Sequence, residues 1–199
     1  MILRSHLLQQ LPWLDHGFGT RRADLTQNAM ASLKQIHSSI TLHAAAAGCI
    51  GEGDALVSSE SGVTVSVRTA DCYPILLVDT RSRVVAAVHS GWRGTAARIV
   101  HAALEKMNAS PEHTFAAIGP GIGACCYEVG EEVGRQFGLN GAGRVDLAEA
   151  NKRLLRAAGV PEANIEILGG CTFCDEDRYY SFRREKEEAG RMISFIGLR

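Results

Sequence analysis

Residues 69–79 read T-A-D-C-Y-P-I-L-L-V-D, and residues 84–94 read V-V-A-A-V-H-S-G-W-R-G. Each stretch joins an apolar run to a reactive side chain, Cys72 in the first and His89 in the second. Short apolar runs bounded by Asp, Ser or Gly are typical of buried strands. An imidazole or a thiol beside such a run is costly unless it finds polar partners. These two side chains are therefore candidates for a functional site.

Further strand and helix patterns extend outward from this pair. Apolar runs rich in Val and Ile predict strands over 63–67, 74–78, 84–88, 115–118 and 165–168, and later ones over 179–183 and 192–198. Helical spacing of apolar residues predicts helices over 93–107, 127–137 and 146–158. Mixed strands and helices in this order predict an α/β (mixed α+β) fold, with a central mixed sheet flanked by helices. At 199 residues the chain is expected to form a single domain, residues 1–199.

The third helix has the clearest boundaries. Asp146 is a plausible N-cap, Glu149 follows three residues later as in a capping box, and Gly159 provides a stop. We therefore expect this helix to begin directly after Asp146.

Composition excludes several classes of function. The formal net charge is −1 and no basic stripe interleaves with aromatic residues, so nucleic acid and anionic membrane are not expected partners. No apolar stretch is long enough to span a membrane, and the N-terminus lacks the apolar core and cleavage site of a signal peptide. The six cysteines are then expected to be free thiols in the reducing cytoplasm. The sequence does not indicate an oligomeric state.

Cys72, His89 and a third residue, His37 in S-L-K-Q-I-H-S-S, could form a metal site. Two imidazoles and one thiolate leave one position open, which distinguishes catalytic zinc sites from closed structural ones. Each of these residues could instead have only a structural role. A free cysteine is commonly a small buried hydrophobe, and a lone histidine on a half-buried strand is usually structural.

Arg93 lies where the strand ending at His89 leads through S-G-W-R-G into a predicted helix. Backbone N–H groups at a helix N-terminus favour an anion, and an arginine there can hold phosphate or carboxylate bidentately. Alternatively, Trp92 and Arg93 only cap and cover the helix.

The remaining cysteines give a weaker signal. Cys171 and Cys174 form a C-x-x-C, while Cys125 and Cys126 are adjacent in a glycine-rich loop. Because the second pair lacks the usual spacing of zinc ligands, the sequence does not predict a structural zinc site from these residues.

Five blocks occur here in one order: T-A-D-C-x-P-I-L-L-x-D, A-x-H-S-G-W-R-G, I-G-P-x-I-G-x-C-C-Y-E-V-G, C-T-x-C and G-R-M. Together they resemble the YfiH/YlmD family, which is described as laccase-domain polyphenol oxidase and is associated with purine nucleoside phosphorylase activity. The resemblance covers roughly residues 14–198. It implies a single domain similar in shape to cytotoxic necrotising factor toxins, and a metal site made of His37, Cys72 and His89. The expected cofactor is zinc, with copper possible.

The same resemblance implies an activity. Family members are described as cleaving adenosine, inosine and methylthioadenosine with phosphate, and as deaminating adenosine. The expected partners are thus small molecules, a purine nucleoside and phosphate. Cys72 and His89 would be catalytic as well as metal ligands, Arg93 would contact substrate or phosphate, and Arg21 in G-F-G-T-R would be a lesser candidate for that contact.

One departure from the family and several competing functions remain. The link 20–37 is short, so the N-terminal region is expected to be shortened, which puts the substrate preference in doubt. A metal-free hydrolase or deamidase could use Cys72 as nucleophile and His89 as base. A peptidoglycan-precursor editing factor and a binding protein without turnover are further alternatives. Copper-dependent polyphenol oxidation is less favoured, because seven scattered histidines supply no H-x-H pair for several copper centres.

Overall fold

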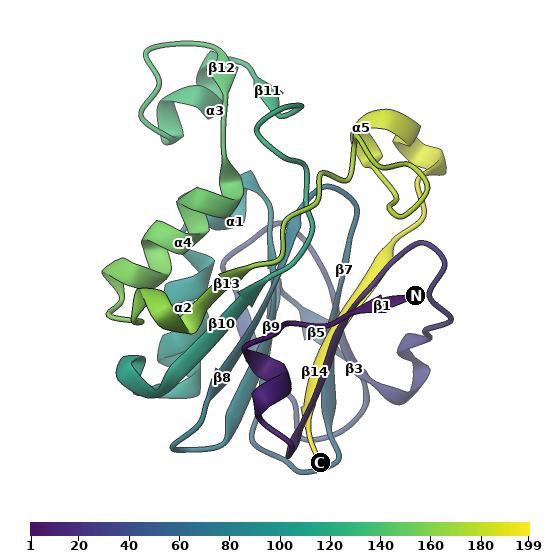
Figure 1. Ribbon diagram of the computed structural model, residues 1–199, viewed down its shortest axis with the longest axis vertical. Helices are drawn as coiled ribbons and strands as arrows, with labels where there is room; N and C mark the ends of the chain where they lie inside the picture. The colour runs from purple at the N-terminus through teal and green to yellow at the C-terminus, as the bar shows by residue number, and fades with distance from the viewer.

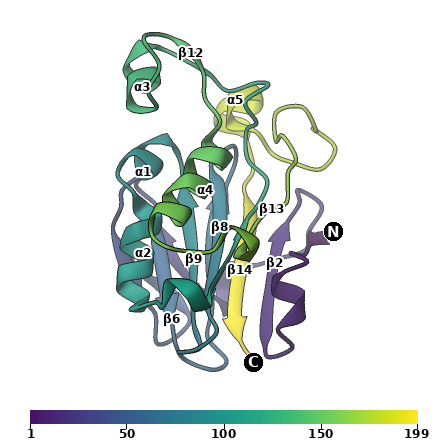
Figure 2. The ribbon, with the colours of Figure 1, turned by 60° about the vertical axis from the view of Figure 1, so that its left-hand side comes forward.

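The computed structural model describes residues 1–199 as three stacked layers, two β-sheets and one layer of helices (Figures 1 and 2). The first sheet has the spatial order β1 (Ile2–Leu3), β2 (Leu14–Gly19), β14 (Met192–Leu198), β7 (Thr64–Thr69), β3 (Ala31–Lys34) and β5 (Gly48–Glu52). The second has the order β13 (Ile165–Ile167), β10 (Thr114–Ile118), β8 (Tyr73–Asp79), β9 (Val84–Ser90), β6 (Ala55–Ser58) and β4 (Thr41–His43).

Helices cover only one face of the second sheet. Helices α1 (Trp92–Ala96), α2 (Ile99–Met107) and α4 (Leu147–Ala157) lie along this face, as Figure 2 shows. Shorter pieces lie near one end of the sheets: α3 (Glu131–Gln136), the two-stranded β11 (Glu128–Val129) and β12 (Gly143–Arg144), and α5 (Phe182–Glu185). Single 3₁₀ turns occupy Leu8–Gln10, Gln27–Ala29, Pro111–His113, Glu162–Asn164 and Lys186–Glu188. None of the helices combines the length and apolar character that crossing a membrane requires.

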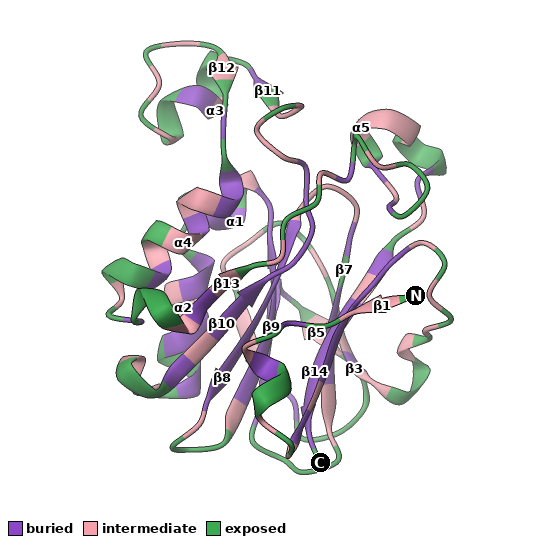
Figure 3. Ribbon diagram, in the orientation of Figure 1, coloured by how far each residue is buried: buried purple, intermediate pink, exposed green.

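Strands β8 and β9 lie at the centre of the molecule and are buried on both faces. They pair antiparallel, with Tyr73 opposite Ser90 at one end and Asp79 opposite Val84 at the other. Along β8, Ile75 and Leu77 join the core beneath the helices, whereas Leu76 and Val78 join the core between the sheets. This explains why the run is continuously apolar, since both sides of the strand avoid water. The purple ribbon of Figure 3 shows the same burial.

The α/β class predicted from the sequence is confirmed, with two mixed sheets where the sequence indicated one. The strands expected over 63–67, 74–78, 84–88, 115–118, 165–168 and 192–198 are all present within one or two residues. The N-terminal strands β1 to β6 were not predicted from the sequence. Several of them are short and partly exposed, so their apolar pattern is weak.

Three predicted elements differ from the structure. The helix expected over 93–107 is interrupted at Arg98, whose left-handed backbone (φ 58°) separates α1 from α2. The helix expected over 127–137 is reduced to α3, because Gly130 begins it and residues 128–129 pair with β12 instead. The strand expected over 179–183 is wrong: Ser181 caps the short helix α5 through its side chain.

Candidate active site

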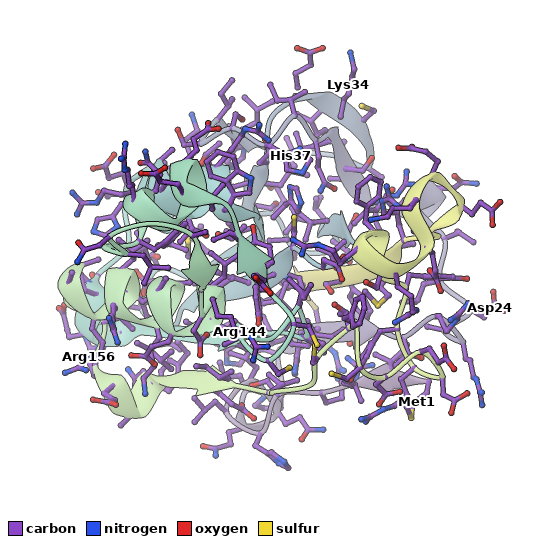
Figure 4. The ribbon with its side chains drawn as sticks, turned by 90° about the horizontal axis from the view of Figure 1, so that it is seen from above. Met1, Asp24, Lys34, His37, Arg144 and Arg156 are labelled. Carbon is purple, nitrogen blue, oxygen red and sulfur yellow. The ribbon has the colours of Figure 1, made fainter.

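The three proposed metal ligands come together at one end of the two sheets. His37 lies in the loop between β3 and β4, Cys72 directly precedes β8, and His89 is the penultimate residue of β9. The Tyr73–Ser90 pair at the end of the β8–β9 ladder places Cys72 beside Gly91. Figure 4 looks onto this end, where His37 lies inward of Lys34.

The ligand atoms of His37, Cys72 and His89 all lie within 4.8 Å of one another. The Sγ atom of Cys72 is 4.0 Å from Nε2 of His37, and the two imidazole rings meet edge to face with centroids 4.9 Å apart. Exposure rises across the set, from buried His89 through half-buried Cys72 to exposed His37. The set is thus anchored in the core and open on one side.

Asp54 holds the ring of His89 and the loop that carries His37, and it was not predicted as a site residue. Its carboxylate is fully buried and accepts a hydrogen bond of 2.8 Å from Nδ1 of His89. It also accepts the backbone N–H groups of Ile36, His37 and Ser38, so the loop wraps around it while His37 adopts a left-handed φ of 60°. Asp54 immediately precedes β6, and its carbonyl accepts the His89 N–H. Only the G-D-A stretch at the start of an apolar run could have indicated it.

The His89–Asp54 contact fixes which ring nitrogen is available. Because Nδ1–H donates to the carboxylate, Nε2 of His89 is left to bind a ligand. A carboxylate behind a histidine in this way is the usual support of a zinc-binding imidazole. A donor set of two imidazoles and one thiol suits zinc or copper. The residues present therefore fit the metal that the family resemblance implies.

Electrostatics favour the charged form of each group in this chain of contacts. Burial raises the pKa of Asp54, but hydrogen bonds from His89 and Ser38 outweigh it and lower the pKa to about 2. Burial likewise raises the pKa of the Cys72 thiol, yet the hydrogen bonds and charges of His37 and His89 lower it overall. For His89 burial lowers the pKa, and the contacts with Asp54 and Cys72 raise it overall. A thiolate is thus accessible at Cys72, which is the form that binds metals and attacks electrophiles.

Gly91 is required by the packing of the site. A Cβ atom at this position would lie 2.8 Å from Sγ of Cys72 and 3.4 Å from Cδ2 of His37. The glycine in H-S-G-W-R-G thus leaves room for two of the proposed ligands.

These residues form the floor of a pocket of about 550 Å³. Its apolar lining includes Leu33, Ile122, Tyr127 and Phe182. Five cations also line it: Lys34, Arg68, Arg183, Lys186 and Arg191. Among these only Lys34 forms a salt bridge, with Glu52 outside the lining. The pocket is therefore positively charged. None of these cations was predicted as a site residue, although Arg191 lies in the G-R-M block.

Two predicted arginines lie outside the pocket lining. Arg93 is exposed, and its guanidinium stacks on the Trp92 ring at 4.4 Å, which matches the alternative in which the pair covers the helix. Arg21 forms a salt bridge with Glu185, donates to the carbonyl of Glu176 and lies over the ring of Tyr180. The structure does not bring either guanidinium together with His37, Cys72 and His89.

Asp71 is the carboxylate inside the pocket. Its two oxygens accept hydrogen bonds from Oγ1 of Thr172 and from the N–H of Arg183, both at 2.7 Å. Glu128, in the C-C-Y-E-V-G block, is exposed and absent from the lining.

The other cysteines also assemble, contrary to the sequence analysis. Cys125 and Cys126 lie with Cys171 and Cys174 in one cluster, with all four sulfur atoms within 4.8 Å of one another. The two pairs are too far apart in sequence for a spacing rule to connect them.

Comparisons with known proteins identify relatives of this chain. The family model described as multi-copper polyphenol oxidoreductase laccase matches residues 19–199. A protein of Deinococcus radiodurans named purine nucleoside phosphorylase is 43% identical over 181 residues, covering 84% of this chain and 70% of the relative. The adenosine deaminase RL5 of an unknown prokaryotic organism is 41% identical, covering 72% of this chain and 61% of the relative.

Solved structures show the same fold. YfiH of Bacillus licheniformis superposes with a TM-score of 0.89 at 23% identity, and the match covers 100% of this chain and 96% of that one. YlmD of Geobacillus stearothermophilus gives a TM-score of 0.88 at 26% identity, with the same coverage. The chain therefore belongs to the multi-copper polyphenol oxidoreductase laccase family, the family of YfiH and YlmD.

Proposed function

We propose that this chain is a zinc-dependent purine nucleoside enzyme that cleaves adenosine, inosine or methylthioadenosine with phosphate. The observation that carries the proposal is the pocket itself. Its floor holds a three-residue metal-ligand set, and four of its lining cations have no carboxylate partner. Unneutralised positive charge in a concave site attracts an anion such as phosphate. The names of the relatives, purine nucleoside phosphorylase and adenosine deaminase, support the same substrate class.

The pocket lining offers both apolar and charged groups for the parts of such a substrate, with the guanidinium of Arg183 5.5 Å from the centre of the Tyr127 ring and that of Arg191 5.9 Å from the centre of the Phe182 ring. Its volume of about 550 Å³ lies in the range of small-molecule sites, roughly 300–1,000 Å³. Tyr127 and Phe182 provide flat apolar surfaces for a purine ring. We assign phosphate to Arg183 and Arg191 in preference to Arg93 and Arg21, because the first two line the pocket.

The catalytic roles follow from the contacts on the floor. His37, Cys72 and His89 would hold the zinc ion, which when bound would act as a Lewis acid toward the substrate. Asp54 holds His89 in one orientation through its 2.8 Å hydrogen bond. Asp71 would supply the proton to the departing purine base, since it is the carboxyl group in the pocket lining. Arg183 and Arg191 would keep the phosphate within reacting distance of the ribose.

A second candidate function has its own observation. The thiol of Cys72, the imidazole of His89 and the carboxylate of Asp54 follow one another in space, and the pKa of the Cys72 thiol is lowered. That arrangement is the one a cysteine hydrolase or deamidase uses to activate its nucleophile. His37 distinguishes the candidates, since it completes a metal site but has no place in the triad.

The first experiment incubates zinc-loaded protein with adenosine, inosine and methylthioadenosine, with and without phosphate, and separates the products. Free purine base released only with phosphate is the expected result. Inosine formed from adenosine without phosphate would indicate deamination. If zinc-loaded protein forms no product from any of the three, the purine nucleoside proposal is wrong. Metal analysis of protein purified without added metal, together with activity after loading with zinc or with copper, decides between the two.

The second experiment compares His37→Ala and Cys72→Ser, with His43→Ala, an exposed histidine on β4, as the matched control. A metal site predicts that both variants bind less zinc than wild type and lose activity together, while the control keeps the zinc content and activity of wild type. A hydrolase predicts a different pattern, in which His37→Ala stays active and Cys72→Ser is inactive.

A further inference from the structure

Four cysteines meet at the end of the second sheet, outside the pocket lining. Cys125 and Cys126 belong to the loop that follows β10, and Cys171 and Cys174 to the segment that follows β13. Strands β10 and β13 pair in parallel, so both chain segments leave the sheet at the same end. Topology, and not sequence spacing, therefore makes one cluster from two distant pairs.

The sulfur positions have the dimensions of a metal site. All four lie within 4.8 Å of one another, with Cys126 and Cys174 at 3.2 Å and Cys125 and Cys174 at 3.7 Å. In a tetrahedral tetrathiolate zinc site, a Zn–S distance of about 2.3 Å places sulfur atoms roughly 3.8 Å apart. All four cysteines are free thiols in the structure.

The backbone holds the two loops together independently of the thiols. The N–H of Gly123 donates to Sγ of Cys171 at 3.2 Å, and the N–H of Thr172 donates to the carbonyl of Gly121 at 3.0 Å. A Cβ atom on Gly123 would lie 3.3 Å from both Sγ of Cys125 and Cβ of Cys171, so glycine permits this approach. N–H donation to a ligating sulfur is the kind of contact that orients and tunes thiolate ligands.

We propose that Cys125, Cys126, Cys171 and Cys174 bind one Zn²⁺ ion as a closed, structural tetrathiolate site. Four protein ligands leave no open position, unlike the three ligands on the pocket floor. The set shares no residue with the proposed active site, so this inference goes beyond the proposed function and stands or fails separately. Soft thiolates select zinc, Cu(I) or iron–sulfur clusters, and the tetrahedral S₄ set commits the proposal to zinc.

Binding there would brace one wall of the pocket. The cysteine loops continue directly into Ile122 and Tyr127, which line the pocket, and into Thr172, which donates to Asp71. Zinc would join these two segments, which lie 45 residues or more apart in the chain, and metal binding of this kind adds to folding stability.

The test is zinc stoichiometry of protein purified under reducing conditions in the presence of zinc. With the pocket zinc of the proposed function in place, wild type should hold two zinc ions per chain. With or without that ion, Cys125→Ser/Cys174→Ser should hold one fewer than wild type and lose thermal stability. His37→Ala/Cys72→Ser should also hold one, and replacing it with Co²⁺ should give the intense absorption of tetrathiolate cobalt. Cys49→Ser, at an exposed cysteine on β5, is the matched control and should keep two.

A measurement on wild type alone covers the case in which the variants do not fold. Alkylation mapped by mass spectrometry should label Cys49 at once, and the four clustered cysteines only after zinc is chelated. Equal zinc content in wild type and Cys125→Ser/Cys174→Ser, unprotected thiols in zinc-loaded protein, iron in place of zinc, or disulfides among the four would each overturn the proposal.

Discussion

At the scale of single residues, Asp54 and Gly91 decide whether the site exists. Neither supplies a ligand atom to the set of His37, Cys72 and His89. The buried Asp54 carboxylate accepts five hydrogen bonds, one from the His89 ring and four from the loop that carries His37, and Gly91 leaves the space that the thiol occupies. The positions of the three ligands thus depend on two neighbouring residues that would not themselves bind the metal.

Gly91→Ala tests this dependence. Its φ is −82°, which any residue adopts, so the added methyl acts only by displacing Cys72, 2.8 Å away. We expect zinc affinity at this site to fall by about 10- to 100-fold, as it does when support of a ligand is lost. Competition with a chelator of known affinity, in a Cys125→Ser/Cys174→Ser background, measures it.

Gly130→Ala is the matched control, because a Cβ atom there meets nothing within 4 Å. Unchanged zinc affinity in both variants would show that the Cys72 thiol can accommodate the added methyl group without leaving its binding position.

At the scale of elements, most of the site residues lie in short loops or at the ends of elements, and few lie within the longer helices. His37 lies in a loop folded around Asp54, Cys72 in the turn before β8, and Arg183 in the four-residue helix α5. Longer elements provide the support. Helix α4, which begins where Asp146 accepts the N–H of Glu149 at 2.9 Å, packs its Leu147 and Leu155 beneath the second sheet.

Asp146→Ala removes this N-cap, which the sequence predicted and the structure confirms. Loss of a capping aspartate should lower the free energy of unfolding by about 0.5–2 kcal/mol. Urea denaturation followed by circular dichroism measures the change. Asp24→Ala, at an exposed aspartate with no hydrogen bond or ion pair, is the control and should change stability by no more than about 0.5 kcal/mol. Equal effects of both substitutions would contradict the capping role.

At the scale of the whole molecule, the two sheets are joined by packing and by a polar clasp. Glu166 on β13, in the second sheet, accepts the N–H groups of His6 and Leu7 and the hydroxyl of Ser5. Those residues follow β1 of the first sheet. Burial raises the pKa of Glu166, but these hydrogen bonds outweigh it and hold the pKa below its usual value.

This clasp makes stability depend on pH. A carboxylate with a lowered folded-state pKa stabilises the protein above its unfolded pKa of about 4.3, and that contribution is lost as the pH falls through the folded value. Glu166→Gln should therefore reduce the free energy of unfolding at pH 7 by about 1–3 kcal/mol, because one acceptor becomes a donor facing an N–H or hydroxyl. The difference from wild type should shrink toward pH 3.

Urea titrations at several pH values between 3 and 7 measure this difference. Glu60→Gln, at an exposed glutamate whose side chain has no partner, should leave the curve unchanged. A deficit in Glu166→Gln that is as large at pH 3 as at pH 7 would show that ionisation of the clasp is not what stabilises the fold.

The sequence by itself determined the buried strands, the α/β class and the identity of His37, Cys72 and His89 as a candidate set. Continuous apolar runs and a motif in fixed order are local properties, so they can be read along the chain. The division of the strands into two sheets was not predicted, because short, partly exposed strands such as β4 and β5 lack a strong pattern. Asp54, the basic lining of the pocket and the four-cysteine cluster were decided only by the tertiary structure. All three features depend on contacts between residues far apart in the chain, such as Asp54 with His89 and Cys125 with Cys174. Sheet register and the parallel pairing of β10 with β13 bring such residues together, and no local spacing encodes either.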